Sequence, residues 1–276
     1  MPESQFFLPS QSCSALVLNY IIIKTALDEK KLEDKYIPDG HTAVVIHFTE
    51  SERFIKTETE RYKLPNRFFT MPVKMNLIFE AEAELETLII NCNTSVFSKV
   101  FGIRMDNIPN KLFSNFDDYM NDYVYDKLKL EKNYQKRIKI FENYLLENYP
   151  IVDYELDEVD LIYREITSSV KNQKICELLS EIKMNHRSFR RQFLRRTGIS
   201  AKELLRIVRV NHVWEMYRRN PKLNFNDIVY ELSFFDQAHF INDFKKIIGE
   251  TPKKFFSRDL RKVETFSGKN NQIALE

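Results

Sequence analysis

Three arginines stand at spacings that bring them to one side of a short helix. Arg187, Arg190 and Arg191 follow Asn185, a residue type that commonly begins helices, and helical positions three and four apart are neighbours. A guanidinium group can donate two hydrogen bonds to O6 and N7 of guanine in the major groove of DNA, although arginine also commonly binds phosphates. A group of arginines on one helical face could bind DNA, and the alternative is a basic face that is merely solvated.

A second group of residues that could contact DNA lies in a segment offset by 51 residues: Gln237, Ala238, His239 and Asn242. Glutamine and asparagine pair with adenine, and an alanine can touch the methyl group of thymine. We expect this set to specify bases less tightly than the arginines do. His239 has an equal alternative as a histidine at a helix end with no base partner, because histidine is partly charged and versatile.

Four further residues are candidates for contact with the DNA backbone. Arg195 and Arg196 lie one helical turn after the three arginines, and Asn185 and Asp236 stand where the two short helices are expected to begin. Contacts to phosphates fix the position of a protein on the duplex but carry no direct sequence information.

Both sets lie in an internal repeat that contains two of the five glycines of the chain. The phenylalanines in each copy are four residues apart and share one helical face, so we expect them in a core and not as stacking platforms for bases. The glycine supplies a left-handed residue that ends the helix. The copies are Asn185-x3-Phe189-x3-Phe193-x4-Gly198-x-Ser200 and Asp236-x3-Phe240-x3-Phe244-x4-Gly249-x-Thr251.

Each repeat is preceded by an apolar, helix-like run, Ile175–Glu181 or Ile228–Leu232, which gives two helix-turn-helix layouts. Between them, Ser200 and Glu203 form a capping box that opens a helix running to about Arg219. Such a helix spans about 28 Å. That length could hold two reading helices near the roughly 34 Å that separates successive major-groove faces, so one molecule could read two adjacent segments.

Residues 155–258 resemble the AraC/XylS family of transcription regulators. The resemblance is strongest over Ile228–Phe240, then Phe244-Lys245-Lys246 and Gly249-Glu250-Thr251-Pro252. It implies a bacterial-type regulator, commonly an activator, whose partners are double-stranded DNA and RNA polymerase. In the family the exposed face of each reading helix enters the major groove, and the positions that match are Arg187, Arg190 and Arg191 in the first helix and Gln237, Ala238, His239 and Asn242 in the second. The sequence does not decide between activation and repression. The turn glycines usual in the family are replaced by Lys183 and Ser233, which changes the expected local turn geometry.

The expected fold class is α+β, with a β-rich regulatory domain before an all-α domain that holds two helix-turn-helix units joined by a long helix. Short β-rich runs such as residues 43–48 and 87–90 are broken by proline and glycine turns. The expected boundaries are 1–115 for the β-rich domain, 116–152 for a helical connector, 153–260 for the DNA-binding domain and 261–276 for a disordered tail.

Charge is divided between the two ends of the chain. Residues 171–262 hold 21 Lys and Arg against 10 Asp and Glu, a net charge of +11, which leaves 21 against 30, a net of −9, elsewhere. A clustered positive charge favours a polyanionic partner. The three scattered cysteines suggest neither a disulfide framework nor a zinc cage, and no apolar run is long enough to span a bilayer. A cytoplasmic protein without cofactor is expected.

An apolar stripe on the connector has two possible uses. Tyr134, Ile138, Phe141 and Leu145 are spaced by 4, 3 and 4 residues, which is the seam of a short coiled coil and predicts a homodimer. The alternative is that the stripe covers the sheet of its own domain.

Two other function classes are alternatives to DNA binding. His41 and His47 at an even spacing, with Glu50 nearby, suggest a metal-binding or enzymatic β-barrel, but too few ligands converge for a metal site, and no enzyme is expected. A protein adaptor with a basic face would leave the paired reading helices without a use. The β-rich domain is of a kind that commonly holds small molecules, although nothing in the sequence identifies an effector.

Overall fold

The computed structural model describes residues 3–25, 31–82, 84–109, 111–168, 179–180, 182–220, 222, 224–232, 234–258 and 260. Most of the run predicted over 175–181 and the whole tail at 261–276 lie outside these residues. The strands are β1 (Glu3–Phe7), β2 (Val17–Lys24), β3 (Lys31–Tyr36), β4 (Thr42–His47), β5 (Arg53–Lys56), β6 (Arg61–Lys63), β7 (Arg67–Thr70), β8 (Leu77–Glu82), β9 (Glu86–Cys92) and β10 (Phe113–Asn115).

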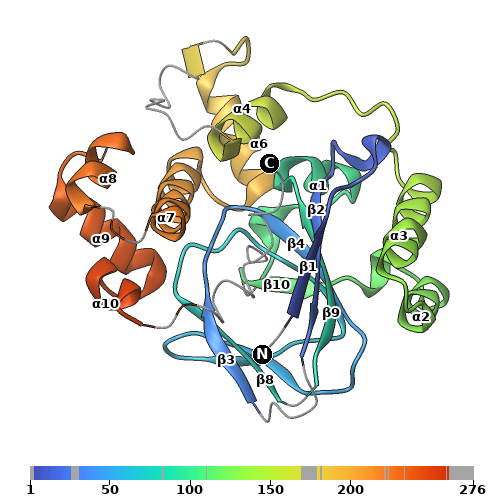
Figure 1. Cartoon of the computed structure of the whole chain (residues 1–276). Helices are drawn as coiled ribbons and strands as arrows, with labels where there is room; N and C mark the ends of the chain where they lie inside the picture. The colour runs from blue at the N-terminus through green and yellow to red at the C-terminus, as the bar shows by residue number, and fades with distance from the viewer. Residues whose placement is uncertain are drawn as a thin grey trace.

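Apart from α1, which lies between β9 and β10, the described helices follow the strands. They are α1 (Thr94–Val100), α2 (Asp122–Leu130), α3 (Tyr134–Asn148), α4 (Glu158–Ser168), α6 (His186–Thr197), α7 (Ala201–Arg219), α8 (Phe225–Glu231), α9 (Gln237–Ile248) and α10 (Pro252–Phe256), with short 3-10 turns at Gln11–Cys13, Met105–Asn107 and Asp117–Tyr119. The predicted α+β class, with a β-rich part before a helical part, is confirmed (Figure 1).

The β-rich part consists of two antiparallel sheets that pack against each other. One sheet has the order β1-β2-β9-β4-β7-β10 and the other β3-β8-β5-β6. Ala43 and Val45 of β4 pack against Ile55 and Leu77 of the smaller sheet. β4 is buried on both faces, because Val44 and Ile46, which alternate with these residues, point into a second core on the other side of the sheet.

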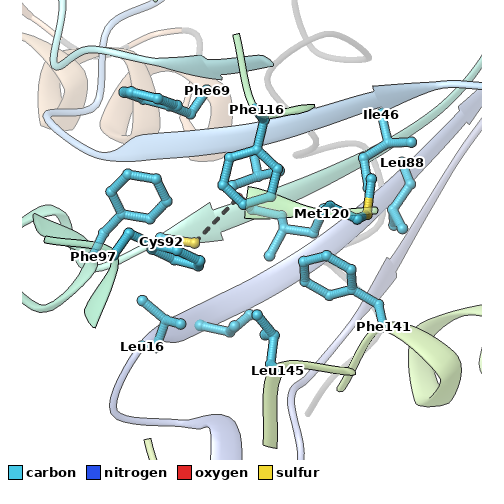
Figure 2. Close-up of a cluster of buried hydrophobic side chains, with 14 of the residues drawn as sticks. Leu16, Ile46, Phe69, Leu88, Cys92, Phe97, Phe116, Met120, Phe141 and Leu145 are labelled. Atoms are coloured by element: carbon cyan, nitrogen blue, oxygen red, sulfur yellow. Dashed lines mark hydrogen bonds between the residues drawn. The ribbon is translucent and has the colours of Figure 1, made fainter. Parts of the chain in front are cut away.

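That second core lies between the larger sheet and the helices α1 and α3 (Figure 2). The stripe predicted on α3 belongs to it: Ile138, Phe141 and Leu145 are all buried, and the ring of Phe141 meets Tyr20 of β2 edge to face. The stripe therefore covers the sheet of its own domain, which is the second of the two alternatives. The seam is therefore occupied within the chain and offers no support for a coiled-coil dimer.

The internal repeat folds as its pattern predicts. Asn185 and Asp236 accept hydrogen bonds from backbone N–H groups as N-caps, and Gly198 and Gly249 end the helices with φ of 72° and 85°. A positive φ of this size strains any residue with a Cβ atom, which explains the glycines. The capping box of Ser200 is also present, and α7 has the predicted 19 residues.

Candidate nucleic-acid interface

The face of α6 that carries the three candidate arginines is open to solvent. Arg187, Arg190 and Arg191 are exposed, whereas Phe189 and Phe193 on the opposite side are each 1% exposed and lie in the core of the helical part. Within the described part of the chain, none of the three guanidinium groups has an ion-pair partner. The buried phenylalanines thus fix α6 with its basic face toward solvent.

Arg196 does not share this open face. Its guanidinium donates hydrogen bonds to both carboxylate oxygens of Asp157, at 2.8 and 2.6 Å, and lies 3.3 Å from the fully buried Asp160. Asp160 also accepts a hydrogen bond from Ser95 of α1, so the cluster joins the β-rich part to the first reading helix. The backbone-contact role predicted for Arg196 would require this cluster to open. Arg195, by contrast, is exposed.

This cluster gives a prediction for the pH dependence of stability. Burial raises the pKa of Asp157, but hydrogen bonds from Arg196 and from the backbone of Asp160 outweigh it and hold the pKa well below its ordinary value of 3.8. A carboxyl with a lowered folded-state pKa contributes stability that is complete above its unfolded pKa and is lost as the pH falls below it. We expect denaturant unfolding at pH 7 to show a loss of stability in Asp157→Asn that shrinks by pH 3. The exposed Asp126→Asn is the control, and an equal loss for Asp157→Asn at both pH values would contradict the assignment.

The other two candidates for contact with the DNA backbone, Asn185 and Asp236, cap helices of the protein. The side chain of Asn185 accepts from the backbone N–H of Ser188, and that of Asp236 accepts from His239 at 2.7 Å. Both residues remain exposed, so a contact with DNA stays a prediction for them.

The corresponding helix of the second repeat, α9, presents a less charged surface. Gln237, Ala238 and Asn242 are exposed, and Phe240 on the opposite side is fully buried. His239 is only partly exposed: its ring meets Phe234 edge to face, and its Nε2 lies 3.4 Å from the carboxylate of Asp243. The histidine therefore has partners inside the protein, in line with the alternative considered for it.

Two exposed aromatic residues of the second helix-turn-helix unit were missed by sequence reasoning. Tyr230 of α8 and Phe235, which directly precedes the N-cap of α9, are 88% and 91% exposed. Phe234 beside it is buried against Phe240. Two consecutive phenylalanines, Phe234 and Phe235, indicate that one of the two rings is exposed, because neighbouring residues point in different directions. Which ring enters the core depends on the conformation of the turn.

A hollow lies between part of α9 and the β-rich part. It has a volume of about 660 Å³ and lies between the β5–β6 turn, which carries Glu58 and Glu60, and the helix residues Asn242, Lys245 and Lys246. The candidate base reader Asn242 therefore borders the β-rich part in this structure. Acidic residues of one part thus face basic residues of the other. The end of α9 approaches Asn76, whose side chain would lie 2.6 Å from a Cβ atom at Gly249.

A small apolar cavity lies between the two sheets. Its volume is about 110 Å³, comparable to cavities that hold a single ring, and its walls are mainly aliphatic and aromatic. His47 is among its few polar residues; burial and the nearby Arg53 hold the pKa of His47 well below its ordinary value, so the imidazole is neutral.

The histidines weighed for a metal site do not converge. His41 Nδ1 lies 2.8 Å from the Tyr163 hydroxyl, His47 Nδ1 lies 2.6 Å from Thr87, and Glu50 pairs with Lys129 on the surface. Over the described ranges, no group of three or more His, Cys, Asp or Glu residues is placed to hold a metal ion. The geometry gives no support to the metal-binding alternative.

The cavity wall continues into the helical part through residues 37–41, which we call the β3–β4 segment. Ile37 lines the cavity and at the same time belongs to the core of the helical part. The carbonyl of Pro38 accepts a hydrogen bond from Asn211 of α7, and the carbonyl of Gly40 accepts one from Tyr163 of α4. The segment is therefore fixed on both sides.

Ion pairs reinforce this junction at its rim. Lys35 of β3 donates to the carbonyl of Ile248 at the end of α9 and pairs with Glu250, and Lys74 pairs with Glu203 at the start of α7. Burial raises the pKa of Glu203, but the hydrogen bond from Lys74 and those from Ser200 outweigh it and lower the pKa to about 2. The end of α9 and the start of α7 are thus attached to the β-rich part.

Several solved structures resemble this chain at low sequence identity. ToxT from Vibrio cholerae is 12% identical, with a TM-score of 0.46 over 83% of this chain and 98% of that one. A ToxT structure bound to an unsaturated fatty acid is 13% identical, with a TM-score of 0.45 over 84% and 96%. The AraC-like transcriptional activator CuxR is 10% identical, with a TM-score of 0.30 over 80% and 95%. The comparison with curated proteins gave no match.

A family model supplies the assignment of the helical part. The model described as "Helix-turn-helix domain" matches residues 178–258, which contain both repeats and the long helix between them. In the described part of the chain no helix is long and apolar enough to cross a membrane. Residues 178–258 are thus a helix-turn-helix domain, a fold through which many proteins bind DNA.

Proposed function

We propose that this chain is a DNA-binding regulator of transcription of the AraC type. One molecule would read two adjacent major-groove segments, with Arg187, Arg190 and Arg191 of α6 in one and Gln237, Ala238 and Asn242 of α9 in the other. The observation that carries the proposal is the outward basic face of α6, which is held by a buried phenylalanine pair. α7 packs against both reading helices, and its 19 residues span about 28 Å.

Selection of preferred sites from a random pool of DNA tests this function with the full chain. We expect a bipartite site whose two halves are about one helical turn apart, with guanines in the half that α6 reads. Recovery of no preferred sequence would contradict base reading, and a single short half-site would contradict the use of both helices.

We further propose that a small apolar molecule in the cavity between the sheets controls DNA binding. The β3–β4 segment supports this proposal, because Ile37 contacts both the cavity and the core that carries the reading helices. Movement of a wall residue on binding would therefore reach the DNA-binding domain through direct contact. A ligand can change DNA affinity only through a difference in its affinity for the two states.

The cavity can be tested with benzene as a probe. We expect benzene to raise the melting temperature of the full chain, since ligands of the folded state stabilise it by mass action. Ala43→Leu, which would fill the cavity from β4, should abolish that rise. An unchanged rise in Ala43→Leu would show that benzene binds elsewhere.

The remaining features of the proposal come from the family resemblance and the sequence. The regulator is expected to act in the cytoplasm, to contact RNA polymerase and to catalyse no reaction, with residues 153–260 as an independent DNA-binding domain and 261–276 as a disordered tail. A homodimer stays a separate proposal. Sedimentation at micromolar concentration would test it, with a monomer as the contradicting result.

A further inference from the structure

Phe235 lies where the second helix-turn-helix unit would meet DNA. It is 91% exposed and immediately precedes Asp236, the N-cap of α9. The exposed residues Gln237 and Ala238 follow directly, so Phe235 continues the edge of the reading surface. A core position is not open to it, because Phe234 fills that position with 6% exposure and packs on the ring of Phe240.

The chemistry of the major groove limits what such a ring can recognise. Base edges there present hydrogen-bond donors and acceptors, and among the four standard bases only thymine adds an apolar group, its C5 methyl. A phenylalanine ring makes no conventional hydrogen bond but can contact this methyl group. The neighbouring candidates Gln237 and Ala238 are uncharged, so an apolar contact could contribute part of the sequence specificity of this helix.

We infer that Phe235 is a specificity-determining residue that recognises the methyl group of a thymine in the half-site read by α9. This inference rests on the proposed function, because it requires α9 to enter the major groove. Burying one methyl group predicts a contribution of about fourfold in affinity. The contact would favour thymine over cytosine without any hydrogen bond from the side chain.

The test uses the full chain and the duplex that it selects from a random pool, with each thymine of the α9 half-site replaced in turn by deoxyuridine, which lacks only the methyl group. We expect one replacement to weaken binding by the wild type about fourfold and to leave binding by Phe235→Ala unchanged. Tyr230→Ala is the matched control, an equally exposed aromatic on α8, and should keep the wild-type response to deoxyuridine.

The outcomes separate the inference from the function on which it rests. If no sequence is selected, the proposed function fails. If a site is selected but no deoxyuridine replacement distinguishes the wild type from Phe235→Ala, or if the α9 half-site contains no thymine, the inference alone is overturned. Unchanged DNA affinity in Phe235→Ala would likewise overturn it and would leave a protein partner as the use of this ring. Circular dichroism of Phe235→Ala checks that α9 is intact.

Discussion

Phe193→Ala should destabilise the helical part by about 3–5 kcal/mol, because it removes most of a buried aromatic side chain and leaves a cavity. Phe193 is 1% exposed, and its ring centroid lies 5.4 Å from that of Phe189. An isolated helix of the length of α6, 12 residues, is marginal in water, so its order depends on this packing. Denaturant unfolding of the full chain measures the loss, and DNA binding should weaken on every sequence because the reading face loses its support.

Leu194→Ala is the matched control for Phe193→Ala. Leu194 is the next residue of the same helix and is 43% exposed, so its truncation should change stability by about 0.5 kcal/mol or less. Equal losses in the two variants would mean that the core contact of Phe193 does not hold α6.

Arg191→Ala should weaken binding to the selected site by about 1–3 kcal/mol while barely changing binding to random DNA, if its guanidinium reads a guanine. Arg191 is exposed and lies away from the buried side of α6, so the variant should unfold at the wild-type denaturant concentration. Titrations of both DNAs over a range of salt concentrations measure the effect. Equal weakening on both DNAs would overturn the role and make Arg187 or Arg190 the better candidate.

Arg195→Ala provides the comparison for a backbone contact. This exposed arginine lies one turn beyond Arg191, and loss of a phosphate contact weakens all sequences about equally. The slope of log affinity against log salt concentration should then fall in magnitude by about one. A sequence-dependent loss for Arg195→Ala would instead assign it to a base.

The features that the sequence predicted well are those whose causes are local. Asn185 and Asp236 cap helices through groups three residues away, and Gly198 and Gly249 adopt a conformation that glycine alone favours. The phenylalanines four residues apart mark the buried side of each reading helix, which also leaves the candidate base readers on the outer side. The direction of α6 and α9 relative to their cores could therefore be predicted.

The features that the sequence could not predict depend on residues far apart in the chain. Arg195 and Arg196 are neighbouring arginines at the end of α6, and the sequence alone does not distinguish them. In the structure Arg196 forms ion pairs with Asp157 and Asp160, whereas Arg195 is exposed. Ile37 is an ordinary apolar residue after a strand until the fold places α7 and the cavity on its two sides. No local pattern encodes such a contact, because the partner is supplied by the packing of two domains.

The position of Ile37 between the cavity and the helical core also has a consequence in the reverse direction. Coupling between two binding sites is reciprocal, so a cavity ligand that changes the affinity for DNA by some factor has its own affinity changed by DNA by the same factor. If the cavity ligand controls DNA binding as proposed, the DNA site in turn controls the affinity of the cavity for its ligand. The protein would then bind its small molecule with one affinity in the absence of DNA and with another when bound to its DNA site. The occupancy of the cavity would therefore depend on whether the protein is bound to that site.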